Sequence, residues 1–260
     1  MKSVLAGVFC AVSCVASAAP VVEKVAYDID GAPFESVLVY DGDRTGKRPG
    51  LLMVPNWLGI NDTAIARAKE LAGDDYVVLV ADMYGTAVRP SNFDEAGEAS
   101  GKVTADRASM RARSQRALQA LKEAGASVLD GDRIVALGFC FGGTTALELA
   151  RTGADIDGVV SFHGNPKPVQ PAAEGEVRAS VLVLHGADDF FVPEENLRAF
   201  EKEMRDANAD WTLVSLSGAR HCFAEKEANN RPPGCLYNER AAKRAYAMLD
   251  RFLDEQFATD

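Results

Sequence analysis

Short apolar runs alternate with longer segments of helical periodicity along most of this chain. An uninterrupted apolar run is typical of a strand that is buried on both faces of a parallel sheet. Strands are predicted at residues 50–55, 76–81, 133–138, 158–162, 180–184 and 211–216, and helices at 61–72, 104–124, 144–151, 194–207 and 238–257. This alternation predicts an α/β fold, with a mainly parallel sheet covered by helices on both faces.

Two segments differ from this pattern. Residues 34–40 alternate between apolar and polar side chains, which predicts a half-exposed strand. Residues 89–102 show no clear period, and we interpret them as a cap segment or lid. In the long helix predicted at 104–124, Leu118 and Leu121 are expected to face the core.

The first 19 residues have the composition of a secretory signal peptide. Lys2 precedes an apolar stretch, and Ala18 or Ala19 ends a small-x-small pattern that signal peptidase accepts. Cleavage there predicts a periplasmic or secreted protein whose residues 20–260 form one domain. Cys14 also permits a lipoprotein interpretation, although the residues before it match a lipobox only loosely. The apolar stretch is short for a membrane span, and no other stretch of the sequence is long and apolar enough.

The overall composition is that of an ordinary globular protein. Of the 260 residues, 47% are hydrophobic and 25% are charged, and the formal net charge is −10. An acidic chain is a poor candidate for nucleic-acid binding, which requires a basic surface. Nothing in the sequence indicates an oligomeric state.

The cysteines suggest one disulfide and one free thiol. Of the five in the chain, signal cleavage would leave Cys140, Cys222 and Cys235. Cys222 and Cys235 are the natural pair, because the loop between them is short and rich in Pro, Gly and Asn. Two unpaired thiols are the alternative.

The feature that points most directly to chemistry is the run Gly138-Phe-Cys-Phe-Gly-Gly143, between a predicted strand and a predicted helix. This is the context of a nucleophile elbow, with Cys140 where serine is more common. The sharp turn needs neighbours without bulk, which Gly138 and Gly142 provide. The sequence therefore predicts Cys140 as a nucleophile. The alternative is a structural cysteine buried in a tight turn.

A nucleophile of this type needs a histidine and an acid, which follow it in the chain in the order acid, then histidine. His221, in the loop after the strand at 211–216, is the expected base. The acid is Asp188 or Asp189, in the loop after the strand at 180–184, and position alone does not choose between them.

The other two histidines, His163 and His185, end strands, and we expect backbone groups to satisfy their rings. No cluster has the spacing of metal ligands, so no metal is predicted. An oxyanion hole would take the backbone N–H of Phe141, after the nucleophile, and that of Trp57, after an early strand.

Together these motifs resemble the dienelactone hydrolase family of α/β-hydrolases over almost the whole mature chain. The resemblance rests on Val54-Pro-Asn-Trp-Leu-Gly59, Ala81-Asp-Met-Tyr84, Gly138-Phe-Cys-Phe-Gly-Gly143, Gly186-Ala-Asp-Asp-Phe-Phe-Val-Pro193 and Gly218-Ala-Arg-His-Cys-Phe223. It implies a Cys–His–Asp triad without a cofactor. It also places the acid four residues before Pro193, which selects Asp189.

Three departures from the family pattern concern the substrate pocket. Family enzymes that open dienelactones carry a glutamate where this chain has Asn56, and they hold the substrate carboxylate with arginines where it has Thr86 and Glu225. Arg89 or Arg220 is the suggested replacement for the arginines that hold the substrate carboxylate. Asn56 and Tyr84 are expected to shape the pocket, and dienelactone itself is not the expected substrate.

The expected function is hydrolysis of a small ester or lactone through a thioester acyl-enzyme. Three alternatives stay open: a thioesterase or dehalogenase-type hydrolase on the same triad, a non-catalytic periplasmic binding protein, and redox sensing by Cys140.

Overall fold

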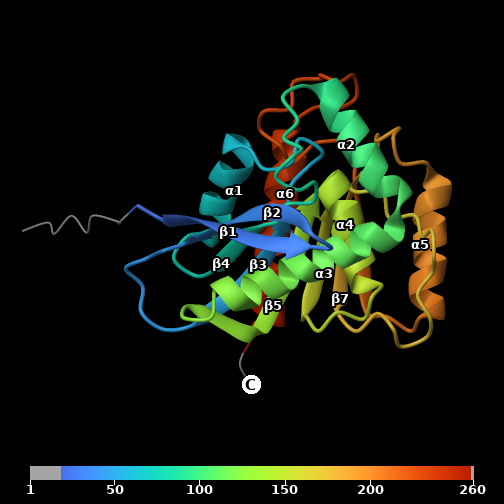
Figure 1. The fold of residues 1–260 in the computed structure, drawn as a ribbon. Helices are drawn as coiled ribbons and strands as arrows, with labels where there is room; N and C mark the ends of the chain where they lie inside the picture. The colour runs from blue at the N-terminus through green and yellow to red at the C-terminus, as the bar shows by residue number, and fades with distance from the viewer. Residues whose placement is uncertain (1–18, 259–260) are drawn as a thin grey trace, which may run out of the picture.

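A computed structural model describes residues 19–258, which contain one eight-stranded sheet (Figure 1). The strand order is β1-β2-β4-β3-β5-β6-β7-β8. Only the β1–β2 and β2–β4 pairings are antiparallel, so the predicted mainly parallel sheet is confirmed. The strands are β1 (Val21–Ile29), β2 (Ala32–Tyr40), β3 (Arg48–Val54), β4 (Val77–Val80), β5 (Leu129–Phe139), β6 (Gly158–Phe162), β7 (Ser180–Gly186) and β8 (Trp211–Leu216).

Helices cover both faces of the sheet. The helices α1 (Asp62–Ala72) and α6 (Glu239–Gln256) pack on one face; α2 (Phe93–Ala105), α3 (Arg107–Ala124), α4 (Phe141–Ala150) and α5 (Glu194–Asp206) cover the other. Successive side chains of a strand point to opposite faces, so Leu51 and Met53 join one core while Leu52 and Val54 join the other. Both faces are apolar, which explains the continuous apolar runs.

The segment before residue 124 differs from prediction. The helix predicted at 104–124 is present as α3, but it begins at Arg107: α2 ends at Ala105, and Asp106 caps α3 by accepting from the Ser109 N–H at 3.0 Å. The stretch 89–102, which shows no clear period and which we interpret from the sequence as a cap segment or lid, is mostly helical. The buried positions of α2 are chiefly alanines, which leave little hydrophobic period to detect.

The N-terminal prediction is only partly within reach of the structure. The expected signal peptide falls outside the described residues, apart from Ala19. Residues 21–29 form β1, which no pattern predicted, because this edge strand is largely exposed and carries charged side chains. In the described range, no helix combines the length and apolar character needed to span a bilayer.

A buried ion network fixes α4 against its neighbours. Arg151, at the end of α4, is 1% exposed and pairs with Glu203 of α5 at 2.8 Å and with Glu148 at 3.1 Å. Every residue of α4 is buried. The helix that follows Cys140 is therefore a rigid support for the sulfur.

Candidate active site

Cys140 occupies a sharp turn between β5 and α4. Its backbone has φ 54° and ψ −117°, a strained conformation for a residue with a side chain. A Cβ at Gly138 would collide with the backbone of Gly142, and one at Gly142 would collide with the carbonyl of Val54. These two glycines therefore permit the turn. It lifts a free, half-buried thiol to the carboxyl edge of the sheet.

The structure brings the predicted triad residues together. Cys140 Sγ lies 3.0 Å from His221 Nε2, and His221 Nδ1 lies 2.7 Å from Asp189 Oδ2. The other Asp189 oxygen accepts from the Phe191 N–H at 2.9 Å, which orients the carboxylate. Asp189 is buried, whereas Asp188 is exposed and has no bond to the histidine.

The surroundings of His221 favour its protonated form. Burial alone would lower the pKa of His221, but the negative charge of Cys140 and the bond to Asp189 outweigh it. They raise the pKa from 6.5 to about 10. A histidine in this state suits a thiolate–imidazolium pair.

Asn56 holds the loop that follows β3. Its side-chain oxygen accepts from the Leu58 N–H at 3.0 Å, and its side-chain nitrogen donates to Glu225 Oε2 at 2.5 Å. Glu225 is 5% exposed, and Arg67 lies 3.5 Å from the same oxygen. Burial raises the pKa of Glu225 despite the opposing effects of Arg67 and Asn56. A residue predicted to shape the pocket thus also braces its wall.

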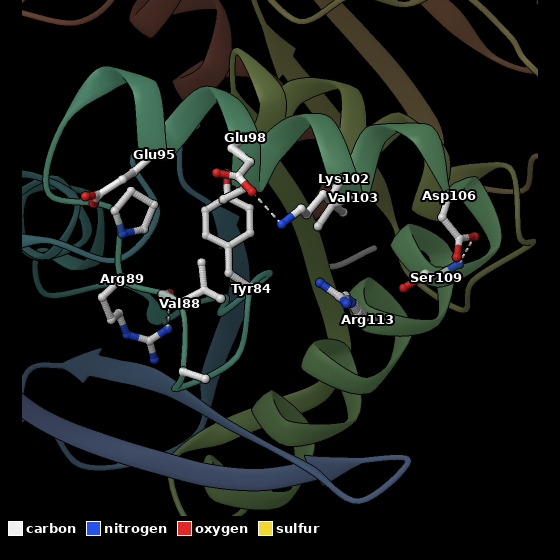
Figure 2. A pocket seen from close by; sticks show the side chains of 13 residues that line it. Tyr84, Val88, Arg89, Glu95, Glu98, Lys102, Val103, Asp106, Ser109 and Arg113 are labelled. Atoms are coloured by element: carbon white, nitrogen blue, oxygen red, sulfur yellow. Dashed lines mark hydrogen bonds and ion pairs between the residues drawn. The ribbon is translucent and has the colours of Figure 1, made fainter.

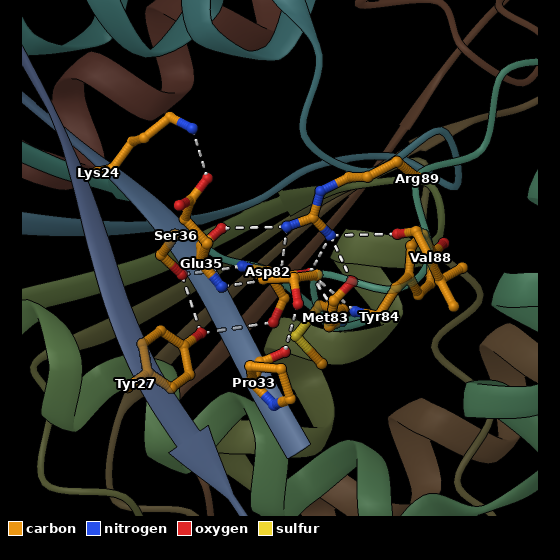
Figure 3. Close-up of polar contacts among 12 residues, drawn as sticks. Lys24, Tyr27, Pro33, Glu35, Ser36, Asp82, Met83, Tyr84, Val88 and Arg89 are labelled. Atoms are coloured by element: carbon orange, nitrogen blue, oxygen red, sulfur yellow. Dashed lines mark hydrogen bonds and ion pairs between the residues drawn. The ribbon is translucent and has the colours of Figure 1, made fainter.

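Trp57 lies on the same loop, and Tyr84 hydrogen-bonds to its backbone. The Tyr84 hydroxyl donates to the Trp57 carbonyl at 2.8 Å. Figure 3 shows how the Asp82 carboxylate anchors the turn of Tyr84, accepting from its N–H at 3.0 Å and from Arg89 at 2.9 Å. The Phe93 ring of α2 stacks on the Trp57 ring, with the two centroids 5.6 Å apart.

Two cavities open on Cys140. The first, of about 280 Å³, contains His221 and is called the His221 cavity; its other walls include Phe141, Phe191 and Val192. The second, of about 230 Å³, contains Asn56 and is called the Asn56 cavity. Trp57 and Cys140 line both.

Tyr84, predicted to line the substrate pocket, lines neither cavity. It faces a groove of about 490 Å³ between α2 and the start of α3, which contains none of the triad residues (Figure 2). Arg89 also faces that groove and is engaged by Asp82. Arg220 is exposed and lines neither cavity. The suggested arginine substitutes are therefore not at Cys140.

A disulfide braces the loop that carries His221. Cys222 and Cys235 are bonded, and the Leu236 N–H donates to the His221 carbonyl at 2.9 Å. Both cysteines line the two cavities. The bridge therefore ties the histidine to the wall of the site.

The two remaining histidines differ from expectation. Among the described residues, neither ring nitrogen of His163 has a hydrogen-bond partner, although Nε2 lies 3.5 Å from Glu225 Oε1, and Nδ1 of His185 has none either. The expectation that backbone groups satisfy these rings is wrong. Burial lowers the pKa of His163 well below its usual value, which keeps the ring neutral. In the part of the chain that the structure describes, no group of three or more His, Cys, Asp or Glu residues is arranged to hold a metal ion.

Comparison with known proteins identifies the family of this site. The dienelactone hydrolase family matches residues 35–257, a range that includes Cys140, Asp189 and His221 and the strands that precede them. The chain belongs to the dienelactone hydrolase family.

Several dienelactone hydrolase-like proteins are similar over much of their length. A crystal structure described as a dienelactone hydrolase-like promiscuous phosphotriesterase from metagenomic libraries is 35% identical, with a TM-score of 0.86; the match covers 93% of this chain and 100% of that one. A Bradyrhizobium protein named "Probable 2-oxo-3-(5-oxofuran-2-ylidene)propanoate lactonase" is 30% identical over 190 residues, 70% of this chain and 75% of that protein. An uncharacterized protein of Caenorhabditis elegans is 36% identical over 160 residues, 60% of this chain and 100% of its own length.

Family membership confirms the predicted α/β-hydrolase fold and the enzyme class. This dienelactone hydrolase family member is a hydrolase of the esterase or lactonase type. The sequence predicts Cys140, His221 and Asp189, which the structure brings into contact, but it does not reveal two supports of the site. They are the Tyr84–Trp57 bond and the Phe93–Trp57 stack. Neither support has a local sequence pattern.

Proposed function

We propose that this protein hydrolyses small esters or lactones with Cys140 as nucleophile, His221 as acid and base, and Asp189 as the group that orients His221. The observation that carries this proposal is the continuous chain of contacts from Cys140 Sγ to His221 at 3.0 Å and from His221 to Asp189 at 2.7 Å. The arrangement matches a nucleophile, a base and an orienting acid in their required order.

In acylation, the Cys140 thiolate attacks the carbonyl carbon and forms a carbon–sulfur bond. Negative charge develops on the carbonyl oxygen, where the N–H groups of Trp57 and Phe141 are the proposed donors. Phe141 is the first residue of α4, so its N–H has no acceptor within the helix. The ester carbon–oxygen bond then breaks. The leaving oxygen takes the proton from His221 Nε2, and a thioester remains.

In deacylation, the neutral His221 takes a proton from water, and the hydroxide adds to the thioester carbon. The carbon–sulfur bond breaks, the acid product leaves, and the thiolate–imidazolium pair is restored. Each oxyanion-hole donor contributes roughly 3 kcal/mol to transition-state stabilisation in enzymes of this kind. The support of Trp57 by Tyr84 and Asn56 is consistent with such a preorganised site.

The test is hydrolysis of a panel of 4-nitrophenyl esters and simple lactones by wild type, Cys140→Ala and His221→Ala. Wild type should turn over, both variants should lose activity by at least about 100-fold, and mass spectrometry of quenched wild type should show one acyl group on Cys140. An alanine variant at position 140 that keeps full activity would overturn the proposal. An acyl-CoA thioester and a haloacetate in the same panel address the alternative bonds.

Phosphotriester hydrolysis is a second candidate. It is favoured by the 35% identical relative described as a promiscuous phosphotriesterase. The His221 cavity has no cation other than His221 among its described lining residues, which suits a neutral phosphotriester. Paraoxon is a suitable probe: repeated release of 4-nitrophenol indicates turnover, whereas release of one equivalent indicates only trapping of Cys140.

We also propose that the mature protein is exported. The predicted signal peptide and the Cys222–Cys235 disulfide both support an oxidising compartment. The mature N-terminus, read by mass spectrometry of protein from the periplasm or medium, should begin at or next to Ala19 or Pro20. An intact Met1 in a cytoplasmic fraction would contradict export.

A further inference from the structure

The two cavities at Cys140 differ in how they are placed relative to His221. His221 lines the His221 cavity and not the Asn56 cavity. In the proposed reaction, His221 protonates the leaving oxygen. The alcohol part of an ester must therefore lie in the His221 cavity, and the acyl part extends toward the Asn56 cavity.

The walls of the His221 cavity are apolar or already hydrogen-bonded. Phe141, Phe191, Val192 and Pro232 contribute apolar surface. Its uncharged polar members, Thr144 and Asn165, bond to each other: Thr144 Oγ1 donates to the Asn165 carbonyl at 3.1 Å and accepts from its N–H at 3.0 Å.

Its volume of about 280 Å³ exceeds the roughly 150 Å³ of an engineered apolar cavity that binds benzene. An aromatic ring therefore fits.

Exposed aromatic side chains extend this apolar surface to the mouth of the site. Phe191 is 45% exposed, and its ring meets the His221 ring edge-on at 5.2 Å. Phe190 is 65% exposed and packs on Phe191 at 4.4 Å. Phe93, at the other side of Trp57, is 44% exposed. Large exposed apolar side chains grouped around a nucleophile favour an apolar ligand.

Two arginines, Arg67 and Arg231, line the Asn56 cavity, and Arg67 is already engaged by carboxylates. Arg67 lies 3.5 Å from Glu225 and 3.4 Å from Glu227, and its guanidinium sits over the Phe139 ring at 4.4 Å. Among the described lining residues of the two cavities, only Arg231 is a permanent cation without a carboxylate partner, and it is exposed. A carboxylate in the His221 cavity would lose water without gaining an arginine or lysine partner, and one in the Asn56 cavity would share Arg67 with Glu225 and Glu227.

We infer that the site takes uncharged esters of aromatic or other apolar alcohols, with the alcohol part in the His221 cavity, and discriminates against esters that carry a carboxylate on either side. This inference rests on the proposed function. It differs from that function in naming the charge and the polarity of each half of the substrate.

The test uses pairs of chromogenic esters that differ by one carboxylate. For the alcohol side, 4-nitrophenyl acetate is compared with 5-acetoxy-2-nitrobenzoic acid; for the acyl side, 4-nitrophenyl pentanoate is compared with mono-4-nitrophenyl glutarate. Rates without enzyme are subtracted. The neutral member of each pair should have a kcat/KM at least tenfold higher. Equal or higher kcat/KM for the charged members, abolished by Arg231→Ala, would overturn the inference and assign Arg231 as a carboxylate-binding residue.

A variant tests where the alcohol part lies. Phe191→Ala should lower kcat/KM for 4-nitrophenyl acetate at least fivefold relative to wild type, but lower it less than twofold for methyl acetate, whose alcohol does not fill the cavity. The methyl ester shares the acyl group and the triad, so it reports any damage to His221. Val169→Ala, an exposed apolar position that lines neither cavity, is the matched control. Equal losses on both esters would refute the placement.

The ester panel distinguishes failure of the proposed ester hydrolysis from failure of the proposed substrate class. If wild type cleaves none of the neutral or charged esters, ester hydrolysis itself is wrong. If it cleaves them through Cys140 but prefers the charged members, the proposed function stands and the substrate class is wrong.

Discussion

The side-chain amide of Asn56 donates to the buried carboxylate of Glu225, with 2.5 Å between the two atoms. The same amide accepts from the Leu58 N–H through its oxygen, so one side chain links a buried charge to the loop that carries Trp57. Asn56 is therefore the donor of this contact and Glu225 its acceptor.

Reversing this hydrogen bond should first damage and then restore the site. In Asn56→Asp, two carboxylates would face each other, and like charges in contact are strongly unfavourable. We expect kcat/KM for 4-nitrophenyl acetate to fall at least about tenfold at pH 8. The loss should be smaller at pH 6, where protonation of one carboxyl relieves the repulsion.

The double variant Asn56→Asp/Glu225→Gln restores a donor and an acceptor with the roles exchanged. We expect it to recover most of the activity that Asn56→Asp loses. Glu225→Gln alone keeps an oxygen that accepts from Asn56 but removes the charge that faces Arg67 at 3.5 Å, so its own loss is measured as one arm of the comparison. This coupling is measured by a double-mutant cycle. Additive losses would show that the Asn56–Glu225 bond does not position the loop.

Tyr84 should act on catalysis through Trp57 without touching substrate. Tyr84→Phe removes the hydroxyl that binds the Trp57 carbonyl at 2.8 Å and leaves the ring in place. A hydrogen bond of this kind contributes about 1 kcal/mol, so kcat should fall roughly fivefold with little change in KM. The control is Tyr40→Phe at the end of β2, where the hydroxyl donates to Glu23 at 3.4 Å and the residue lines neither cavity; it should leave both constants unchanged. A loss confined to KM would place Tyr84 in substrate binding instead.

The proximity of the triad residues was predictable from the chain. Cys140, Asp189 and His221 follow β5, β7 and β8, and the carboxyl ends of neighbouring parallel strands meet at one edge of a sheet. The choice between Asp188 and Asp189 was not predictable from spacing, because it depends on the turn after β7. The resemblance to the family supplied it.

Contacts between distant segments could not be predicted. Asn56 and Glu225 are 169 residues apart, and no local pattern indicates that the two meet. The α2–α3 break was missed for a different reason: alanines at the buried positions of α2 weaken its period, and the helix-forming sequence continues past Asp106. His163 was misjudged because strand-end position does not reveal that both ring nitrogens lack partners.

The raised pKa of His221 predicts an unusual pH profile. Imidazolium is needed to protonate the leaving group, and the pKa of His221 is raised to about 10. The kcat/KM of wild type should therefore stay level as pH rises from 7 to 9 and decline only near 10. A histidine whose pKa is raised in the folded state stabilises the fold while it is protonated. The stabilisation from protonated His221 is therefore fully present below pH 6.5 and is lost progressively as pH rises to about 10. A decline centred near 6.5 would contradict the thiolate–imidazolium pair.

Removing the Asp189 charge should move that decline to lower pH. In Asp189→Asn the bond and charge that raise the pKa of His221 are weakened, so the alkaline limb shifts down. The kcat should also fall, although by less than the roughly 10⁴-fold loss seen in serine triads, because a thiolate nucleophile needs no histidine to remove its proton during the attack. Asp188→Asn, at the exposed neighbouring position, is the control and should keep the wild-type profile.

The disulfide should stabilise both the fold and the position of His221. Cys222 and Cys235 close a loop with a sequence separation of 13, and a bridge over a loop of this size contributes about 3 kcal/mol. In a domain of this length, about 2–4 °C per kcal/mol is expected. The Cys222→Ser/Cys235→Ser variant should therefore lower Tm by roughly 6–12 °C.

The same variant should lower kcat/KM, because Cys222 directly follows His221 and Cys235 lines both cavities. Cys140→Ser keeps the bridge, so it should not show the Tm loss of roughly 6–12 °C expected for the double serine variant, which separates the effect of the bridge from loss of the nucleophile. A reductant should reproduce the stability loss in wild type and leave the double serine variant unchanged. A Tm unaffected by either treatment would show that the bridge does not stabilise this loop.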